Sequence, residues 1–451
     1  MPERRLLGAA VAALLALGGC TTLIPSYQRP AAPVPATYPI ETTPAAAATS
    51  PPAAEIEWQR FFADERLKRL IGLALANNRD LRVAVLNIEQ TRALYDVRRA
   101  DQLPSIGVGG TVARQANGQG GLGKVYAVGL AVTGYELDLF GRVHALSEAA
   151  LDQYLASAET RKAVQISLVA SVATSYLALL ADDELLAVTR QTLATREDST
   201  RLTKLRFDNG ASSELDYRQS ESLLEGARIA LAQALRQRAL DENAFQLLVG
   251  QPLPADLPAA LPLDERQLAT DLPAGRPSEL LARRPDIRAA EQQLLAANAN
   301  IGAARAALFP RISLTGSFAL TGAGQLLQPL FDAGRNRANL EVAKFNRDIA
   351  VAQYEKAIQT AFREVADALA GRATLGEQLR AQAAQTNALA ITYRLADLRY
   401  RAGASSYLDA LDAQRSLFVA QQALVQTRAL QLQNGVALYR VLAGGWKDPP
   451  P

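Results

Sequence analysis

The chain has few side chains that could carry out covalent or metal chemistry, because its 451 residues include one Cys, Cys20, and one His, His144. Cys/His metal sites, Ser-His-Asp and Cys-His triads and disulfide frameworks need more of these side chains. A carboxylate-based hydrolase stays open on composition, because 45 residues are acidic. Its acids would have to converge in one pocket, whereas here they are spread along helical faces. We therefore predict no catalytic residue, no metal site and no cofactor.

The position of the lone thiol predicts a covalent modification. A basic start and a short apolar stretch over residues 6–17 are typical of a secretory signal. The stretch ends in Leu17-Gly18-Gly19-Cys20, which resembles a bacterial lipobox, in which cleavage before the Cys frees it for lipidation. An ordinary signal peptide with an incidental Cys is the alternative. We predict a signal peptide over residues 1–19 and lipidation at Cys20.

The residues after the Cys predict a tether and a destination. Thr21 follows directly, which resembles the default sorting of Gram-negative lipoproteins to the outer membrane. Residues 20–56 are rich in Pro, Ala and Thr and have no period, so we predict a lipid anchor and an extended tether. One lipid modification anchors weakly unless a second membrane contact exists. The rest of the chain should supply that contact, while a formal net charge of +3 argues against a nucleic-acid partner.

An internal duplication organises the chain. Residues 206–216 return as 399–409 at an offset of 193 residues, and residues 103–106 return as 309–312 at an offset of 206. The second copy therefore lacks 13 residues before Gly334. The predicted organisation is a first repeat over 57–250 with a β hairpin at 104–136, a connector over 251–279, a second repeat over 280–445 with a β segment at 310–331, and a tail over 446–451.

Each repeat is predicted to contain one very long helix, at about 141–208 and 335–401, because neither stretch contains a Pro. Helices on the order of 100 Å long are stable only when they pack lengthwise against partners. Residues 163–181 carry no charge and are long enough to suggest a membrane helix. Their repeat partner contains Arg363 and Glu364, so we predict a packed helix there instead.

Three segments alternate between apolar and small or polar residues, as strands do. In the first repeat, Ser105–Ala113 and Lys124–Tyr135 flank a Gly- and Asn-rich turn at 117–123. In the second repeat, residues 312–321 alternate in the same way. This period is typical of membrane barrel strands, although a hairpin packed on a soluble core shows it too.

The number of strands then requires several copies of the chain. One chain supplies at most four strands, whereas single-chain barrels need at least about eight, and an open sheet edge cannot face lipid. Three protomers with four strands each would close a barrel of about twelve strands. A polar barrel interior that long helices continue would form a tube.

Several segments closely resemble the TolC/OprM-type outer membrane factors, in their NodT-like lipoprotein branch. The resemblance covers nearly the whole chain. It is carried by Leu17–Cys20, Tyr135–Arg142, Leu281–Ile287, Ala297–Arg305, Phe331–Ala338 and Ala361–Leu369.

The resemblance implies a mainly helical fold with membrane β structure: a duplicated unit of helix, β hairpin, long helix and helix. It implies a homotrimer with a shared outer-membrane β-barrel and a periplasmic α-helical tunnel. Such proteins contact outer-membrane lipid and receive substrate from an inner-membrane pump, here expected to be of the RND type, through a periplasmic adaptor protein. We therefore predict a passive efflux or secretion duct that is not an enzyme; a periplasmic coiled-coil lipoprotein or adaptor without a channel is the alternative.

The second hairpin departs from the family pattern. Residues 325–330 are too few for a strand that spans the membrane, and Pro329 lies among them. We predict that this hairpin is truncated and that residues 325–330 do not supply a membrane-spanning fourth strand.

The ends of the long helices carry the candidate site. Asn209-Gly210 and Ala402-Gly403 are typical helix stops, and the segments that begin at Ser213 and Ser406 are typical capping boxes. A purely structural capping role for these residues is therefore one interpretation. The resemblance implies a second role, in which the exposed tips dock the adaptor; by motif position these are Gly210, Ala211, Ser212, Gly403, Ala404 and Ser405.

The resemblance also implies a periplasmic gate near these tips. Asp409 and Asp412 match acidic rings that close the pore, and Leu408 matches an apolar constriction. Asp216 and Tyr400 match partners in the closing network. Asp412 lies one turn beyond the capping position and has Gln219 as its repeat counterpart, so a cap does not explain it.

Overall fold

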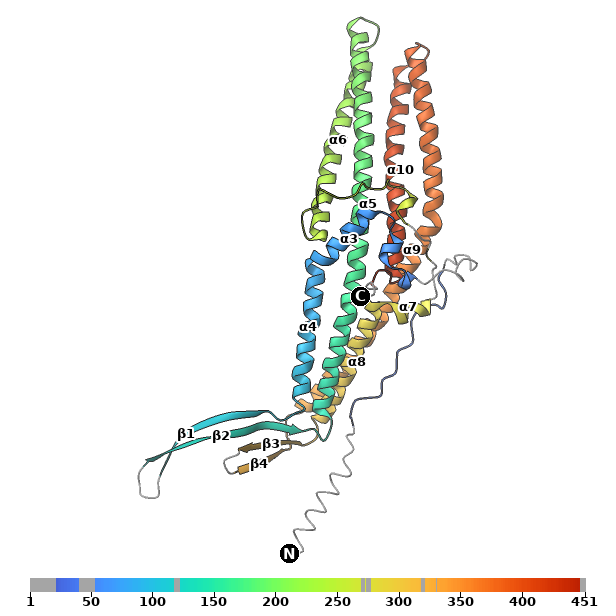
Figure 1. The fold of residues 1–451 in the computed structure, drawn as a ribbon. Coiled ribbons are helices and arrows are strands. Elements are labelled where there is room, and N and C mark those ends of the chain that lie inside the picture. Colours follow the sequence, from blue (N-terminus) through green and yellow to red (C-terminus); the bar gives the residue numbers. More distant parts are fainter. Residues whose placement is uncertain are drawn as a thin grey trace. The chain divides into compact units, whose positions relative to one another are not determined.

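The computed structural model describes residues 22–39, 53–116, 122–268, 272, 277–317, 321–329 and 331–446 (Figure 1). Cys20, the predicted signal peptide and residues 447–451 of the predicted tail lie outside the described residues. In chain order the elements are η2 (Ala53–Glu55), α2 (Trp58–Phe61), α3 (Glu65–Asn77), α4 (Arg79–Ala100), β1 (Ile106–Ala116), β2 (Leu122–Leu137), α5 (Arg142–Asp208), α6 (Glu214–Val249), η3 (Glu265–Gln267), α7 (Pro277–Arg283), α8 (Pro285–Ala306), β3 (Arg311–Ser317), β4 (Thr321–Leu327), α9 (Arg335–Arg401) and α10 (Tyr407–Val441).

The chain divides into two compact units. Unit 1 comprises residues 1–33, 84–161 and 285–359, and unit 2 comprises residues 34–83, 162–284 and 360–451. Unit 1 holds the four strands and α8, whereas unit 2 holds α3, α6 and α10. The two long helices, α5 and α9, contribute to both units, and each has 67 residues as the absence of Pro predicted.

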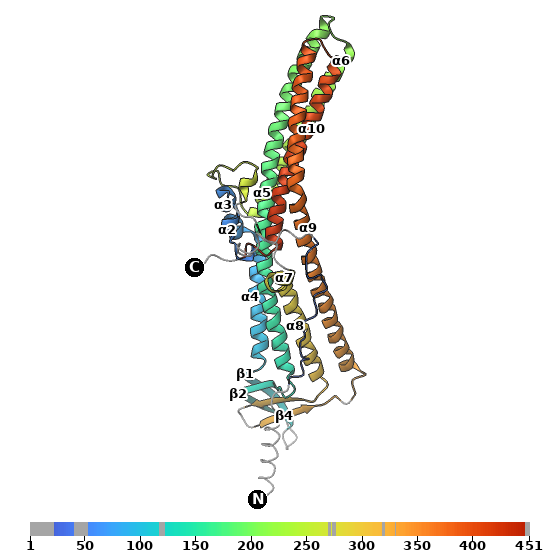
Figure 2. The same ribbon diagram turned by 90° about the vertical axis from the view of Figure 1, so that its right-hand side faces the viewer.

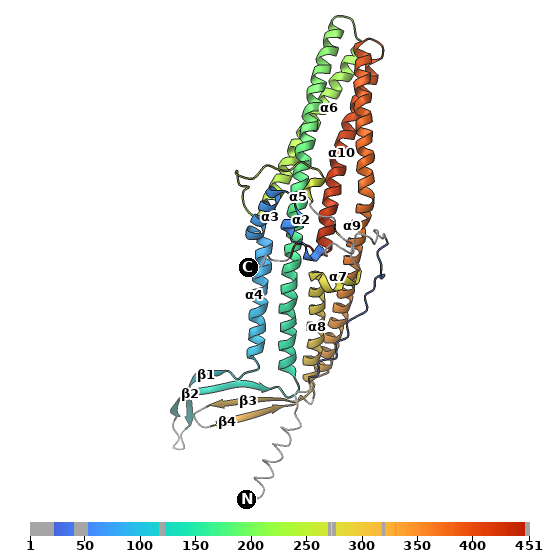
Figure 3. The same cartoon turned by 45° about the vertical axis from the view of Figure 1, so that its right-hand side comes forward.

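The sheet of unit 1 is antiparallel, with strand order β1-β2-β3-β4 (Figure 3). Its register aligns the apolar positions of neighbouring strands, since Val108 pairs with Leu130 and Val112 with Tyr126. Val108 and Val128 are each 77% exposed, so this apolar face packs against nothing in the described chain. The alternation therefore belongs to an open apolar surface and does not cover a soluble core.

A bulge in β2 keeps this apolar face continuous across the sheet. The register to β3 runs from Val132↔Gly316 to Tyr135↔Leu314, so β2 contains one residue more than β3 over this span. The extra residue moves the odd-numbered Tyr135 onto the face that the even-numbered Val132 occupied. Gly134 supplies the required left-handed backbone, with φ of +69°.

The second hairpin corrects the sequence prediction in one respect and confirms it in another. A fourth strand, β4, does form, and it begins at Thr321. The alternation over residues 312–321 had suggested that the third strand continued as far as this residue. β3 and β4 pair over seven positions, from Arg311↔Leu327 to Ser317↔Thr321. This register pairs the backbone groups along all of β3, whereas a return strand confined to residues 325–330 would leave part of β3 without a partner. Each strand has seven residues, so the hairpin is indeed short, and Pro329 lies beyond it.

Unit 2 is built around two helical hairpins, α5–α6 and α9–α10, which run alongside each other (Figures 1 and 2). At their base, the ring of Phe61 stacks on that of Tyr439 at 4.1 Å, and the Tyr439 hydroxyl donates to the Ile56 carbonyl at 2.6 Å. Val172 and Leu177 of α5 are buried there. The apolar stretch of α5, which by length and composition could cross a membrane, is thus half buried within the protein, which favours the packed interpretation.

The segment after the predicted anchor is docked onto helices, which its composition did not indicate. Residues 22–39 form no helix or strand. In unit 1 the Arg29 guanidinium makes two hydrogen bonds, each of 2.7 Å, to the carboxylate of Glu291 on α8. In unit 2 the buried ring of Tyr38 stacks on Phe362 of α9 at 5.2 Å.

Candidate functional site at the helical hairpin ends

The two hairpins of unit 2 reverse through the same turn. Gly210 and Gly403 have φ of +73° and +74°. The amide of Gly210 donates to Phe207, and the amide of Ala211 donates to Arg206 at 2.8 Å; the second hairpin repeats both bonds. This pair of hydrogen bonds, together with a Gly in the left-handed conformation, is the Schellman motif, which provides donors for the last carbonyls of a helix. The sequence duplication is therefore preserved as a duplicated turn.

The returning helices are capped as their sequences predict. The Ser213 hydroxyl accepts from the amide of Asp216 at 3.1 Å, and the Asp216 carboxylate accepts from the amide of Ser213, which completes a capping box. In the second hairpin the Ser406 hydroxyl accepts from the amide of Asp409 at 3.4 Å. The cap accounts for the carboxylate of Asp216, whereas that of Asp409 is exposed.

Three of the predicted gate residues lie on the first two turns of α10. Asp412 is exposed and lies 3.3 Å from the guanidinium of Arg415, one turn further along. Leu408 is 48% exposed, although it is a large apolar side chain. Leu408, Asp409 and Asp412 thus present an apolar group and two carboxylates close to the tip of the second hairpin.

Tyr400 lies on a contact between the two hairpins that the sequence did not reveal. Its ring is 4.7 Å from the guanidinium carbon of Arg206, at the end of α5, and 4.9 Å from the ring of Tyr407. Its hydroxyl is buried and has no hydrogen-bond partner among the described residues. Within one chain Tyr400 therefore contacts Arg206 and Tyr407, and its predicted role in the closing network stays a prediction. Arg206 is the repeat counterpart of Arg399, which precedes Tyr400. This correspondence was the sequence signal that Arg206 lies at the same level of its hairpin as Tyr400.

Burial shifts the protonation of the tyrosine that closes this contact. Tyr407 is 6% exposed, and burial raises the pKa of its phenol. Because its folded pKa is raised, the neutral phenol is the form that the packed hairpin stabilises, and that stability is present at neutral pH and lost only in strong alkali. The tip contact therefore does not titrate near neutral pH through this group.

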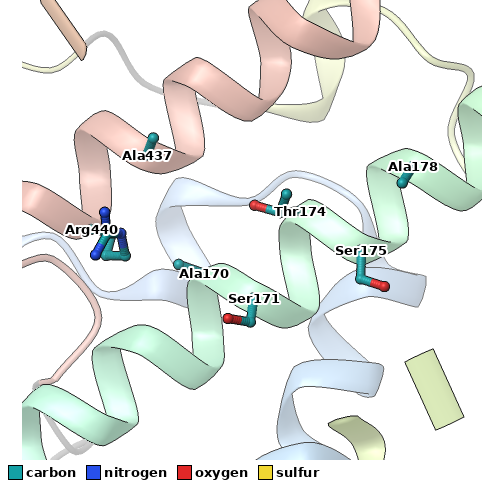
Figure 4. A pocket seen from close by; sticks show the side chains of 7 residues that line it. All are labelled: Ala170, Ser171, Thr174, Ser175, Ala178, Ala437 and Arg440. Carbon is teal, nitrogen blue, oxygen red and sulfur yellow. The ribbon is translucent and has the colours of Figure 1, made fainter. Parts of the chain in front are cut away.

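A small pocket lies between α5 and α10 at the base of the hairpins (Figure 4). Its volume is about 330 Å³. Ser171, Thr174 and Ser175 project from α5, and Ala437 and Arg440 lie across from them on α10. Within the described ranges, no group of three or more His, Cys, Asp or Glu side chains lies close enough together to hold a metal ion.

Comparison with known proteins decides between the classes that the geometry allows. The family model of the outer membrane efflux proteins matches residues 70–251 and 276–444. The chain belongs to this family.

Two relatives and two solved structures extend this result. The toluene efflux pump outer membrane protein TtgC of Pseudomonas putida is 48% identical, with 99% of this chain and 96% of that protein covered. The outer membrane protein OprJ of Pseudomonas aeruginosa is 44% identical, with 96% and 95% covered. A membrane protein from Pseudomonas aeruginosa has a TM-score of 0.86 at 42% identity, covering 94% of this chain and 98% of that one. The open state of the Neisseria gonorrhoeae MtrE channel has a TM-score of 0.85 at 40% identity, covering 95% and 99%.

These similarities confirm the resemblance stated from the motifs and the TolC-like fold. This efflux protein is an outer membrane component of an efflux pump, with a periplasmic helical tunnel. The family is one of channels and efflux proteins, which favours the duct over the periplasmic adaptor alternative.

Proposed function

We propose that this efflux protein is a lipid-anchored homotrimer that conducts substrate passively across the outer membrane. The main support for a trimer comes from the sheet. Its apolar face is exposed, and its edge strands β1 and β4 have no further neighbour in the described chain. Unpaired strand edges cannot face lipid, so further copies of the chain must pair with them. The energy for export then comes from an inner-membrane pump, which we infer to be of the RND type.

A periplasmic adaptor is proposed to link that pump to the hairpin ends. The tips that would contact it are exposed at Gly210 and Ala211 in the first hairpin and at Gly403 and Ala404 in the second. Ser212 and Ser405 are half-buried beside them. Two equivalent turns on each of three protomers would present six small, rigid tips, which suits docking by a second ring of helices.

The gate is proposed to lie at the start of α10. Around a threefold axis, Asp409 and Asp412 would form two carboxylate rings next to a ring of Leu408. Such rings favour cations and oppose anions, and the apolar ring excludes water from the constriction. Tyr400 and Asp216 are proposed to support the closed state, Tyr400 through its buried contact with Arg206 and Asp216 through the cap that orders its hairpin.

Lipid anchoring at Cys20 is supported by the way the following residues dock on α8. The Leu23 carbonyl accepts from Arg305 at 3.2 Å, and the Pro25 carbonyl accepts from Asn298 at 2.8 Å. Arg305 lies in the last turn of α8, six positions before β3 begins at Arg311. Leu23 is three positions after Cys20 in the chain, a step that spans at most about 11 Å. A lipid on Cys20 would therefore enter the membrane close to the base of the strands.

Electron microscopy of the purified full-length protein in detergent tests the proposed assembly, and mass analysis of its N-terminus tests the anchor. We expect threefold particles and an N-terminal lipidated Cys20. Stable monomers that remain soluble in water after removal of the acyl chains would contradict the proposal. A trimer with an unmodified Cys20 would contradict only the anchor.

A glycine on α8 offers a selective test of the docked segment. A β-carbon at Gly302 would lie 2.6 Å from the Ile24 side chain and 2.9 Å from its backbone nitrogen. Gly302→Ala should therefore push the segment off α8 and destabilise unit 1 by about 1–3 kcal/mol, seen as a lower thermal midpoint and faster chymotryptic cleavage after Tyr27.

The matched control is Gly72→Ala in α3, where a β-carbon would meet nothing within 4 Å. Ala is favoured over Gly inside a helix by roughly 0.5–1 kcal/mol. Gly72→Ala should therefore raise the thermal midpoint and leave the cleavage unchanged. If both variants shifted the midpoint in the same direction, the close contact of Ile24 with Gly302 would have no energetic weight.

A further inference from the structure

One buried charge in unit 2 has no counter-charge. Arg196 of α5 is 5% exposed, between the two helical hairpins. Its Nη1 group donates to the Leu223 carbonyl of α6 at 2.9 Å, and its Nε has no hydrogen-bond partner. Among the residues that the structure describes, no Asp or Glu lies within the 4.0 Å of an ion pair with Arg196.

The second hairpin covers this guanidinium with an aromatic ring and a like charge. The Arg196 guanidinium carbon lies 5.3 Å from the ring centroid of Phe418 on α10. Burial lowers the pKa of Arg196, and the positive charge of Arg415 lowers it further. Arg415 also forms an ion pair with Asp412, so the buried cation and the proposed gate acid both interact with the Arg415 guanidinium, the first by repulsion and the second by attraction.

A buried ion without a partner costs free energy that hydration would return. Removing a charge from water costs several kcal/mol unless an opposite charge and hydrogen bonds replace the water. Here one carbonyl and one aromatic face replace it, and neither carries a full negative charge. Moving α10 away from α5 would let water reach Arg196. The packed arrangement of the hairpins is thus opposed by a charge that lies inside it.

We propose that Arg196 is a positioning residue that biases the second hairpin away from the first and so sets the open–closed balance of the gate. This inference rests on the proposed gate at Asp409 and Asp412. The contact of Arg206 with Tyr400 acts in the opposite direction, because that pair is attractive and joins the same two hairpins nearer the tips.

The experiment compares charge removal with charge retention in the full-length trimer. Arg196→Met keeps a long apolar side chain, Arg196→Gln keeps hydrogen bonding without charge, and Arg196→Lys keeps the charge. Each is placed in the Asp409→Ala, Asp412→Ala background, where current through planar bilayers should be measurable. Arg196→Met and Arg196→Gln should lower the open probability at least about fivefold and raise the thermal midpoint, whereas Arg196→Lys should leave both near the background values.

A second readout is independent of the gate acids. Spin labels on Ser212→Cys and Ser405→Cys report the distance between the hairpin tips, and Cys20 is not labelled once it carries its lipid. With Arg196→Met the distance distribution should narrow and shift to shorter values. Unchanged distances, or a lower thermal midpoint for both Arg196→Met and Arg196→Gln, would show that Arg196 only stabilises the packing and would overturn the inference. If the double Ala background itself carried no extra current while the distances shortened, the gate assignment would fail and the role of Arg196 in hairpin packing would stand.

Discussion

Replacing Asp409 and Asp412 together by Ala should make the channel several-fold leakier, measured as single-channel current in planar bilayers and as cellular uptake of a large antibiotic. In a trimer the change removes six carboxylates from the narrowest part of the proposed gate. It also removes the ion pair of Asp412 with Arg415, whose atoms lie 3.3 Å apart. Cations held in the rings would no longer block the pore, and the smaller side chains would widen it.

The control for this prediction is Asp198→Ala. Asp198 forms an ion pair of the same i,i+3 kind with Arg201 on α5, and both side chains are highly exposed. Surface pairs of this kind contribute at most about 1 kcal/mol, so the current should stay at the wild-type level. Equal currents from the double variant and from wild type would remove Asp409 and Asp412 from the gate.

Placing arginines on the apolar face of the sheet should abolish assembly in the outer membrane. Val108 and Val128 are each 77% exposed on neighbouring strands of one face. A lipid-facing Arg near the bilayer midplane costs about 2–4 kcal/mol, and a trimer would contain six in the variant Val108→Arg, Val128→Arg. We expect loss of heat-resistant trimer from the outer membrane fraction and loss of efflux.

Thr111→Arg is the matched control for this face. Thr111 lies in the same strand but at an odd position, so its side chain points to the opposite side of the sheet. That side would line the polar interior of the proposed barrel, where the guanidinium of the introduced Arg stays hydrated. A trimer level for Thr111→Arg as low as that for the double variant would show that the two faces are equivalent, and the barrel proposal would fail.

The sequence alone predicted those features whose causes are local. The absence of Pro and the duplication predicted the bounds of α5 and α9 to within a residue or two. Gly210 and Gly403 marked the turns, and Ser213 and Ser406 marked the caps, because each of these motifs forms within a few consecutive residues. Long motif matches identified the family and located the acids of the proposed gate.

Contacts between distant segments were decided only by the tertiary structure. The bulge at Gly134 keeps the apolar face of β2 aligned with that of β3, and the early start of β4 follows from its pairing with β3. The docking of residues 22–29 on α8 depends on Glu291, which no local pattern links to Arg29. Arg196 and Arg206 are ordinary helical arginines in sequence, and they acquire their roles only because α10 and α9 cover them. Local motifs act through a few adjacent backbone groups, whereas burial and the pairing of charges depend on which segments the fold brings together.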